Sequence, residues 1–151
     1  MRPWRMINLA LCACCFGVML GNASLLAACG GRNTSLPKEV ATSERAAISP
    51  SGKYILVVVA GQDGVVRFQS FQILDRDGEP LFLSPERFGT RHTTYFLWDQ
   101  DDRVWVYSGD VGTCFLECNA STGEWETHIY VQSNIPAPAF LKKMRPEGHP
   151  K

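Results

Sequence analysis

Short apolar segments separated by polar turns fill residues 46–130, and they predict a β-rich domain. Several segments alternate apolar and polar residues with the two-residue period of a strand, and the turns between them are rich in Gly, Asp and Asn. The segment 54–60 is apolar without interruption, which is typical of a central strand buried on both faces. The predicted strands are 46–49, 54–60, 65–74, 80–83, 93–98, 104–108, 113–119 and 125–130.

These strands fall into two similar groups, 46–83 and 93–130, each about 40 residues long. The first opens with Ile48-Ser49-Pro50-Ser51-Gly52-Lys53-Tyr54-Ile55, which resembles the start of many β-propeller repeats, and residues 96–105 form a degenerate second copy. Two blades cannot close a ring that normally needs at least four. We therefore expect an all-β fold in which two antiparallel β-meanders form a small sandwich or a curled sheet. Self-association into a larger assembly is the alternative.

The N-terminal residues follow a different pattern, in which Arg2 and Arg5 precede an apolar stretch from Met6 to Met19. This order is typical of an export signal, because positive charge keeps that end in the cytoplasm while the apolar part enters the membrane. The stretch leads into Leu26-Ala27-Ala28-Cys29, which resembles the lipobox of bacterial lipoproteins.

The resemblance implies that residues 1–28 are a signal peptide and that Cys29 is lipidated and becomes the first mature residue. Two or three acyl chains anchor a protein stably, whereas one chain is marginal. The protein is then expected on the cell membrane or the outer membrane, facing outside the cytoplasm. Two alternatives stay open: a secretory signal cleaved after Ala27 or Ala28, and an uncleaved anchor from Met6 to Ala28 that is long enough to cross a bilayer.

The mature chain divides by composition into a flexible tether, a β domain and a Pro-rich basic tail, with boundaries at 29–45, 46–132 and 133–151. The tail is expected to be disordered, although Phe140 and Leu141 could dock on the sheet. The chain has 15 Lys and Arg against 15 Asp and Glu, so loss of Arg2 and Arg5 leaves a mature net charge of −2. Nothing in that balance indicates a nucleic-acid partner.

Cys114 and Cys118 are expected on one face of the same strand, roughly 13 Å apart at ~3.3 Å per residue. A disulfide needs Cα atoms within about 7 Å, so reduced, buried cysteines are favoured unless a bulge brings the pair together. His92, His128 and His149 do not have the spacing of metal ligands. The sequence predicts no cofactor.

Two acidic turns are weak candidates for chemistry. Asp75 and Asp77 resemble the start of a calcium loop, with Glu86 at its twelfth position, but the apolar residues between favour a hairpin turn. The second turn contains Asp99, Asp101 and Asp102. Their polar side chains are explained without any chemistry if they keep a hairpin tip exposed to solvent. Because the chain has no Gly-x-Ser-x-Gly elbow and no phosphate loop, we do not expect an enzyme. A metal-dependent hydrolase using these acids is the alternative.

Three aromatic residues, Tyr95, Trp105 and Tyr107, are the candidate partner-binding residues. They are predicted on the strand face opposite Phe96 and Trp98, so if that face is core, theirs is open to an envelope protein or a carbohydrate. Burial of both faces is the alternative. The predicted function is that of a membrane-anchored lipoprotein with a small β-rich binding or interaction domain, and a purely structural envelope protein is the other possibility.

Overall fold

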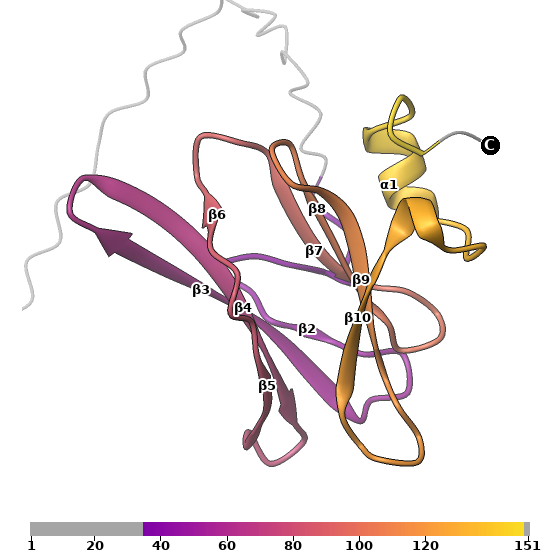
Figure 1. The fold of residues 1–151 in the computed structure, drawn as a ribbon. Helices are drawn as coiled ribbons and strands as arrows, with labels where there is room; N and C mark the ends of the chain where they lie inside the picture. Colours follow the sequence, from indigo (N-terminus) through magenta and orange to yellow (C-terminus); the bar gives the residue numbers. More distant parts are fainter. Residues whose placement is uncertain (1–34, 150–151) are drawn as a thin grey trace, which may run out of the picture. The chain divides into compact units, whose positions relative to one another are not determined.

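A computed structural model describes residues 35–149, where β-structure dominates (Figure 1). The predicted signal peptide, residues 1–28, and Cys29 lie outside this range. The elements are β1 (Val40–Ala41), β2 (Ala47–Ile48), β3 (Tyr54–Asp63), β4 (Val66–Asp75), β5 (Pro80–Leu83), β6 (Phe88–Gly89), β7 (Thr94–Trp98), β8 (Val104–Ser108), β9 (Gly112–Cys118), β10 (Trp125–Ile129), a 3-10 turn η1 (Tyr130–Gln132) and α1 (Ala139–Met144). They form two antiparallel sheets, ordered β1-β7-β8-β9-β10 and β2-β3-β4-β5, with β6 paired to β4. The predicted all-β fold is confirmed.

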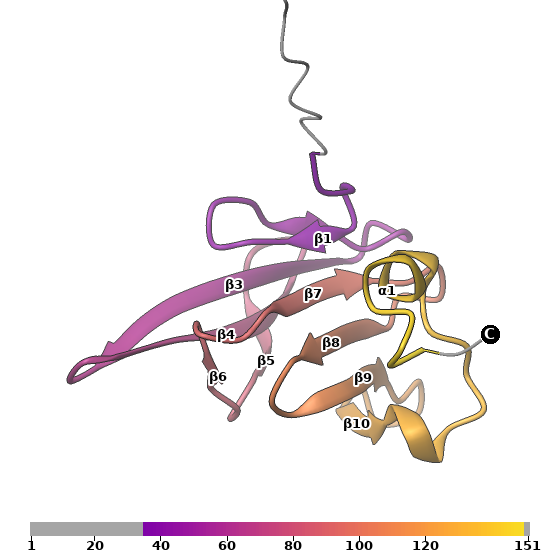
Figure 2. The ribbon, with the colours of Figure 1, turned by 90° about the horizontal axis from the view of Figure 1, so that it is seen from above.

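Each sheet is built on one of the two predicted meanders. Strands β2 to β5 follow one another in one sheet, and strands β7 to β10 do so in the other. Two short strands widen them, because β1 pairs with the free edge of β7 and β6 pairs with β4. The longest hairpin joins β3 and β4 through Gly64 and Val65, and it projects well beyond its neighbours (Figure 2).

The two sheets enclose a core of aromatic and aliphatic side chains between them. Phe71 of one sheet packs on Phe96 of the other with ring centroids 5.5 Å apart, and Trp98 donates its Nε1–H to the Ala47 carbonyl oxygen at 2.9 Å. Side chains of this size contribute about 1.5–3 kcal/mol each when fully buried. The buried members of the core are Ala41, Ala47, Leu56, Val58, Phe71, Ile73, Phe88, Phe96, Trp98, Val104, Val106, Leu116 and Trp125.

Strand β3 corrects one prediction, because its apolar run is buried on one face only. Leu56 and Val58 point into the core, whereas Val57 and Val59 on the other face are half-buried. On that outer face Ile48 of β2 is 65% exposed. The reason is that no layer of residues 35–149 packs on this side of the sheet, so continuous apolar character here does not mean burial on both faces.

The N-terminal boundary of the domain also differs from the prediction, since part of the expected tether is folded. Val40 and Ala41 are buried and pair with Leu97 and Phe96 of β7. They fold because the edge of β7 would otherwise leave its backbone groups unpaired.

The expected disordered tail is likewise packed on the domain, which corrects that prediction in favour of docking. Leu141 of α1 and Ala137 are buried against the outer face of the sheet formed by β7, β8 and β9. His149 is buried too, with its imidazole within hydrogen-bond distance of Thr113 Oγ1 and the Arg145 carbonyl oxygen, at 3.0 and 2.9 Å. Among residues 35–149 no helix has both the length and the apolar content needed to cross a membrane.

Candidate functional site

The three aromatic residues singled out by the sequence do lie on one sheet face, but that face is not open. Trp105 is 0% exposed, and Tyr95 and Tyr107 are half-buried with ring centroids 6.1 Å apart. Phe140 of α1 packs edge-on against Tyr95 at 5.1 Å, and the Arg145 guanidinium lies 5.3 Å from the centre of the Tyr107 ring.

The prediction of an exposed aromatic patch at Tyr95, Trp105 and Tyr107 is therefore wrong for this structure. The chain supplies its own cover, because the segment from Ala137 to His149 packs where a partner was expected. An aromatic sheet face needs a second apolar layer to cover it. The proline-rich tail contains only isolated apolar residues, so the sequence contained little indication that it forms this layer.

The acidic turn between β7 and β8 is held by its own hydrogen bonds. Asp99 accepts bonds from the backbone N–H groups of Asp101 and Arg103 at 2.9 and 3.0 Å. Its Oδ2 also accepts from Arg103 Nε and from Trp105 Nε1, each at 2.7 Å. Asp102 has a φ of 59°, and its Oδ1 accepts from the N–H of Ser51 at 3.0 Å. The carboxylates of Asp99 and Asp102 thus organise this turn and join it to the β2–β3 turn.

The turn between β4 and β5 has a similar internal role. Asp75 Oδ1 accepts hydrogen bonds from the N–H groups of Asp77 and Glu79, both at 2.9 Å. This is the behaviour of an aspartate that closes a turn. No group of three or more His, Cys, Asp or Glu side chains that could hold a metal ion occurs between residues 35 and 149.

The two cysteines of β9 are free thiols, as predicted. Cys114 and Cys118 pair with Ile129 and Trp125 of β10 in a register without a bulge. Both are half-buried rather than fully buried. Burial raises the pKa of Cys114, and the negative charge of Glu86 raises it further.

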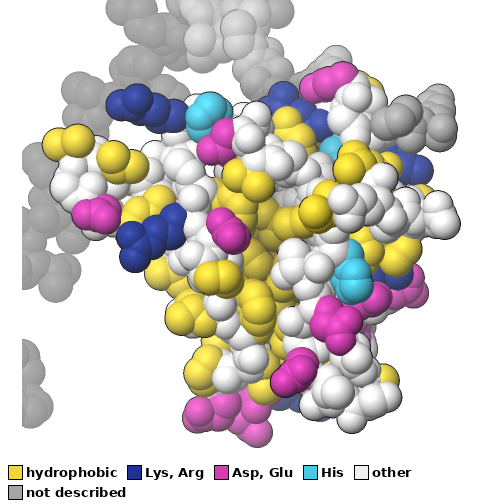
Figure 3. All heavy atoms as spheres, viewed as in Figure 1, with side chains coloured by type: hydrophobic (Ala, Val, Ile, Leu, Met, Phe, Trp, Pro, Cys, Tyr) yellow, Lys and Arg dark blue, Asp and Glu magenta, His cyan; other side chains and the backbone are white. Residues whose placement is uncertain are grey.

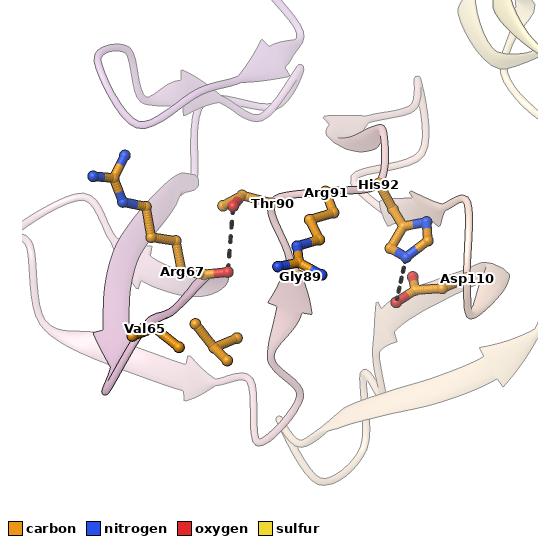
Figure 4. Close-up of a pocket in the computed structure, with 8 residues that line it drawn as sticks. Val65, Arg67, Gly89, Thr90, Arg91, His92 and Asp110 are labelled. Atoms are coloured by element: carbon orange, nitrogen blue, oxygen red, sulfur yellow. Dashed lines mark hydrogen bonds and ion pairs between the residues drawn. The ribbon is translucent and has the colours of Figure 1, made fainter.

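A hollow of about 380 Å³ beside the tip of the β3–β4 hairpin is the remaining candidate, and the sequence did not reveal it (Figure 4). Its polar residues come from β4, from the loop that follows β6 and from the β8–β9 turn, so no local motif connects them. Thr90 fixes the loop to β4, because its N–H and its hydroxyl both donate to the Arg67 carbonyl oxygen at 3.2 and 3.3 Å. The lining residues of interest are Val66, Arg67, Thr90, Arg91, His92 and Asp110.

A histidine and a carboxylate border this hollow. His92 Nε2 lies 4.0 Å from Asp110 Oδ2, and Ser108 donates its hydroxyl hydrogen to Asp110. The hydrogen bond from Ser108 lowers the pKa of Asp110, and the nearby His92 also lowers it. The order of these groups differs from that of a hydrolytic triad, in which the histidine lies between the hydroxyl and the carboxylate.

The lining of the hollow combines the cationic side chains of Arg67 and Arg91 with the carboxylate of Asp110. Figure 4 shows the Arg91 guanidinium beside Gly89 within the hollow, whereas the Arg67 side chain is directed away. A guanidinium presents several N–H donors in a plane that matches a carboxylate or a phosphate. Comparison of the chain with protein-family models, curated proteins and solved structures found no match.

Proposed function

We propose that the protein is a bacterial lipoprotein, acylated on Cys29, that carries a small all-β binding domain outside the cytoplasm. The observation that carries the proposal is the order of Arg2, Arg5, the apolar stretch and the lipobox-like Leu26-Ala27-Ala28-Cys29. Each part has its own physical role in export and anchoring.

The start of the folded domain supports this arrangement. Arg45 Nη2 donates to the carbonyl oxygens of Leu36, Pro37 and Val40 at 3.2, 2.6 and 2.9 Å, so the chain is attached to the domain from Leu36 onward. Residues 30–35 are then the connection to the lipid, and six residues can span at most about 22 Å. The proposed anchor therefore keeps the domain close to the membrane surface.

Binding is favoured over catalysis because two acids of the alternative hydrolase are already engaged. Asp99 and Asp75 accept hydrogen bonds within their own turns. The hollow beside the β3–β4 hairpin is the candidate binding site, and its Arg91 fits an anionic group of a partner molecule. Under the proposal, that partner is an envelope component within reach of the anchored domain.

The mass of the intact protein extracted from membranes tests the anchor. We expect a chain that begins at Cys29 and carries the added mass of its acyl groups, with Cys114→Ala as a control that keeps this modification. Cys29→Ala should abolish it. A chain that begins near residue 28 with an unmodified Cys29, or one that retains Met1, would contradict the proposal and favour the secretory or the transmembrane alternative respectively.

A titration with inorganic phosphate tests the hollow. We expect shifts in the NMR signals of Thr90 and His92 with a millimolar Kd, which is typical of one exposed guanidinium meeting a small anion. Arg91→Ala should remove these shifts. Arg87→Ala is the matched control, because Arg87 lies over the Phe68 ring and pairs with Asp63 outside the hollow. Equal shifts in both variants would exclude Arg91 as the anion ligand.

A further inference from the structure

We propose that one end of the domain docks on the anionic phospholipid head groups of the membrane that carries the anchor. This docking end consists of the tip of the β3–β4 hairpin, the loop after β6 and the β8–β9 turn, which are residues 63–67, 90–93 and 109–111. The inference rests on the proposed lipidation of Cys29, and it names the partner of the hollow that these three segments enclose.

Exposed aliphatic side chains occupy the protruding parts of the docking end. Val65 and Val66 are 96% and 59% exposed at the hairpin tip, and Val111 of the β8–β9 turn is 65% exposed. The free edge of β3 leaves the tip accessible, because among residues 35–149 β2 pairs only with Ile55 and Leu56 at the far end of this strand. Aliphatic side chains on projecting turns can enter the interfacial layer of a bilayer, with basic residues beside them.

Polar groups at the hairpin tip already have partners within the chain. Gln62 Nε2 donates to the Gly64 carbonyl oxygen at 2.8 Å, and the Asp63 carboxylate lies 3.6 Å from the Arg87 guanidinium. A polar group that is paired internally loses less when it leaves water than an unpaired one does. The tip can therefore approach the bilayer without leaving these groups unsatisfied.

Two arginines of the docking end are available to lipid phosphates. Arg67 and Arg91 are exposed, and among residues 35–149 no acidic side chain lies within ion-pair distance of either. The one acid beside the hollow, Asp110, has His92 as its neighbour at 4.0 Å. A guanidinium matches the geometry of a phosphate, so these arginines complement an anionic head group.

Charge is distributed unevenly between the two ends of the domain. Seven acidic and three basic residues lie in the turns at the opposite end, which are 49–53, 75–79, 99–103 and 119–124. Four acidic residues and six Lys or Arg lie at or near the docking end, in segments 63–67, 84–93, 109–111 and 137–149. Figure 3 shows apolar and basic side chains at the hairpin tip and acidic ones at the lower end. An anionic surface therefore attracts the docking end and repels the other.

The connection to Cys29 is long enough for docking. Arg45 holds Leu36 beside the paired strands β1 and β7, close to Phe96. Phe96 packs on Phe71, and Val66 lies five residues away from Phe71 along β4, which is about 17 Å. The six residues 30–35 span at most about 22 Å. A membrane surface at the hairpin tip is thus within reach of the anchor.

A fluorescent probe at the hairpin tip tests the proposal on the acylated protein extracted from membranes. Val65→Cys is labelled with the environment-sensitive dye NBD, and the protein is incorporated into vesicles of phosphatidylcholine with or without phosphatidylglycerol. We expect the fluorescence to rise severalfold only with phosphatidylglycerol, and to fall again at about 1 M salt, where the screening length is about 3 Å. Unsubstituted protein gives the background from Cys114 and Cys118, and Ser121→Cys, at the opposite end, is the control position.

Charge variants of the labelled protein test which cations are responsible. Each of Arg67→Gln and Arg91→Gln should lower the ratio of docked to free domains about fivefold, which corresponds to about 1 kcal/mol per cation at a membrane surface. Lys53→Gln is the matched control, because it removes the same charge from an exposed position at the opposite end and should leave the ratio unchanged.

The proposal is overturned if the probe at residue 65 stays in water on vesicles with phosphatidylglycerol. It is equally overturned if the probe responds alike on both kinds of vesicle, or if Lys53→Gln has the same effect as Arg91→Gln. Flotation with pure phosphatidylcholine vesicles reports the acyl anchor separately. Loss of flotation contradicts the lipidation of Cys29, whereas flotation with an unresponsive probe contradicts docking alone and leaves this end to another partner.

Discussion

The Asp99 carboxylate accepts hydrogen bonds from the backbone of its own turn, from the Arg103 guanidinium and from the Trp105 indole N–H. Trp105 belongs to the aromatic layer under α1, so this residue connects a hairpin tip to the packing of the far face of the sheet. A carboxylate with several short bonds to charged and neutral donors stabilises a fold more than a typical surface ion pair does. The sequence could identify Asp99 as polar and turn-forming, but not as the acceptor shared by these groups.

Asp99→Ala should therefore lower the free energy of unfolding by about 2–3 kcal/mol, because it leaves the half-buried guanidinium and the indole N–H without their acceptor. Asp101→Ala is the matched control, since Asp101 is exposed and contacts only Arg103 through its side chain. Its effect should stay within about 0.5 kcal/mol. Urea unfolding measures both, and equal effects would show that Asp99 has no special role.

Cys114 should titrate above the ordinary range of a thiol, because burial and the charge of Glu86 raise its pKa. A raised folded-state pKa gives stability that is present below the unfolded value of about 8.5 and lost as the pH rises through the folded value. Glu86→Gln should lower the pKa of Cys114, so that iodoacetamide labels this thiol faster at pH 8.5. Mass spectrometry of the Cys114 peptide measures the rate, and an unchanged rate would contradict the assigned role of Glu86. Glu79→Gln is the control.

At the scale of elements, the C-terminal segment completes the fold of the sheet formed by β7, β8 and β9. This sheet has two apolar faces, and α1 with its flanking residues covers the one that does not face the other sheet. The alternation of Phe96 and Trp98 with Tyr95 and Leu97 predicts such a two-sided strand. It does not say whether a partner or the chain itself provides the second layer.

Leu141→Ala should destabilise the domain by about 2–4 kcal/mol, because it leaves a cavity between α1 and the sheet. Met144→Ala, in the same helix but at an exposed position, should change the stability by less than about 0.5 kcal/mol. The midpoint of urea unfolding distinguishes them. A small effect of Leu141→Ala would mean that the helix is not held on the sheet in solution.

At the scale of the whole molecule, the folded unit begins earlier than composition indicated. Contacts place residues 35–149 in one compact unit, and β1 supplies the edge strand next to β7. Strand β1 could not be recognised in the sequence, because its two apolar residues lie among polar ones and a two-residue strand is too short for a periodic signal.

A chain that starts at residue 30 should therefore fold, whereas one that starts at residue 46 should lose about 2–4 kcal/mol. The shorter chain lacks the buried Val40 and Ala41 and exposes the edge of β7. Circular dichroism during urea unfolding measures this difference. Equal stability of the two chains would restore the boundary at residue 46.

Much of the architecture could be predicted because two-residue periodicity and turn chemistry are local. The hairpins around Gly64, Asp75 and Asp99 follow from such signals. Features that depend on long-range pairing could not be predicted, among them the free edge of β3 and the hollow beside Arg91. A strand's apolar content reports how much surface it can bury, but not which of its sides finds a neighbour.

The short connection that Arg45 leaves between Cys29 and the domain has a consequence for how copies of the protein meet. Under the proposed anchoring, encounters take place in two dimensions, within a thin layer at the membrane, so the local concentration of copies exceeds that of the same chain in dilute solution. A weak contact between copies would then be populated at the membrane and would dissociate once the anchor is removed. A chain with Cys29→Ala should therefore be monomeric in dilute solution.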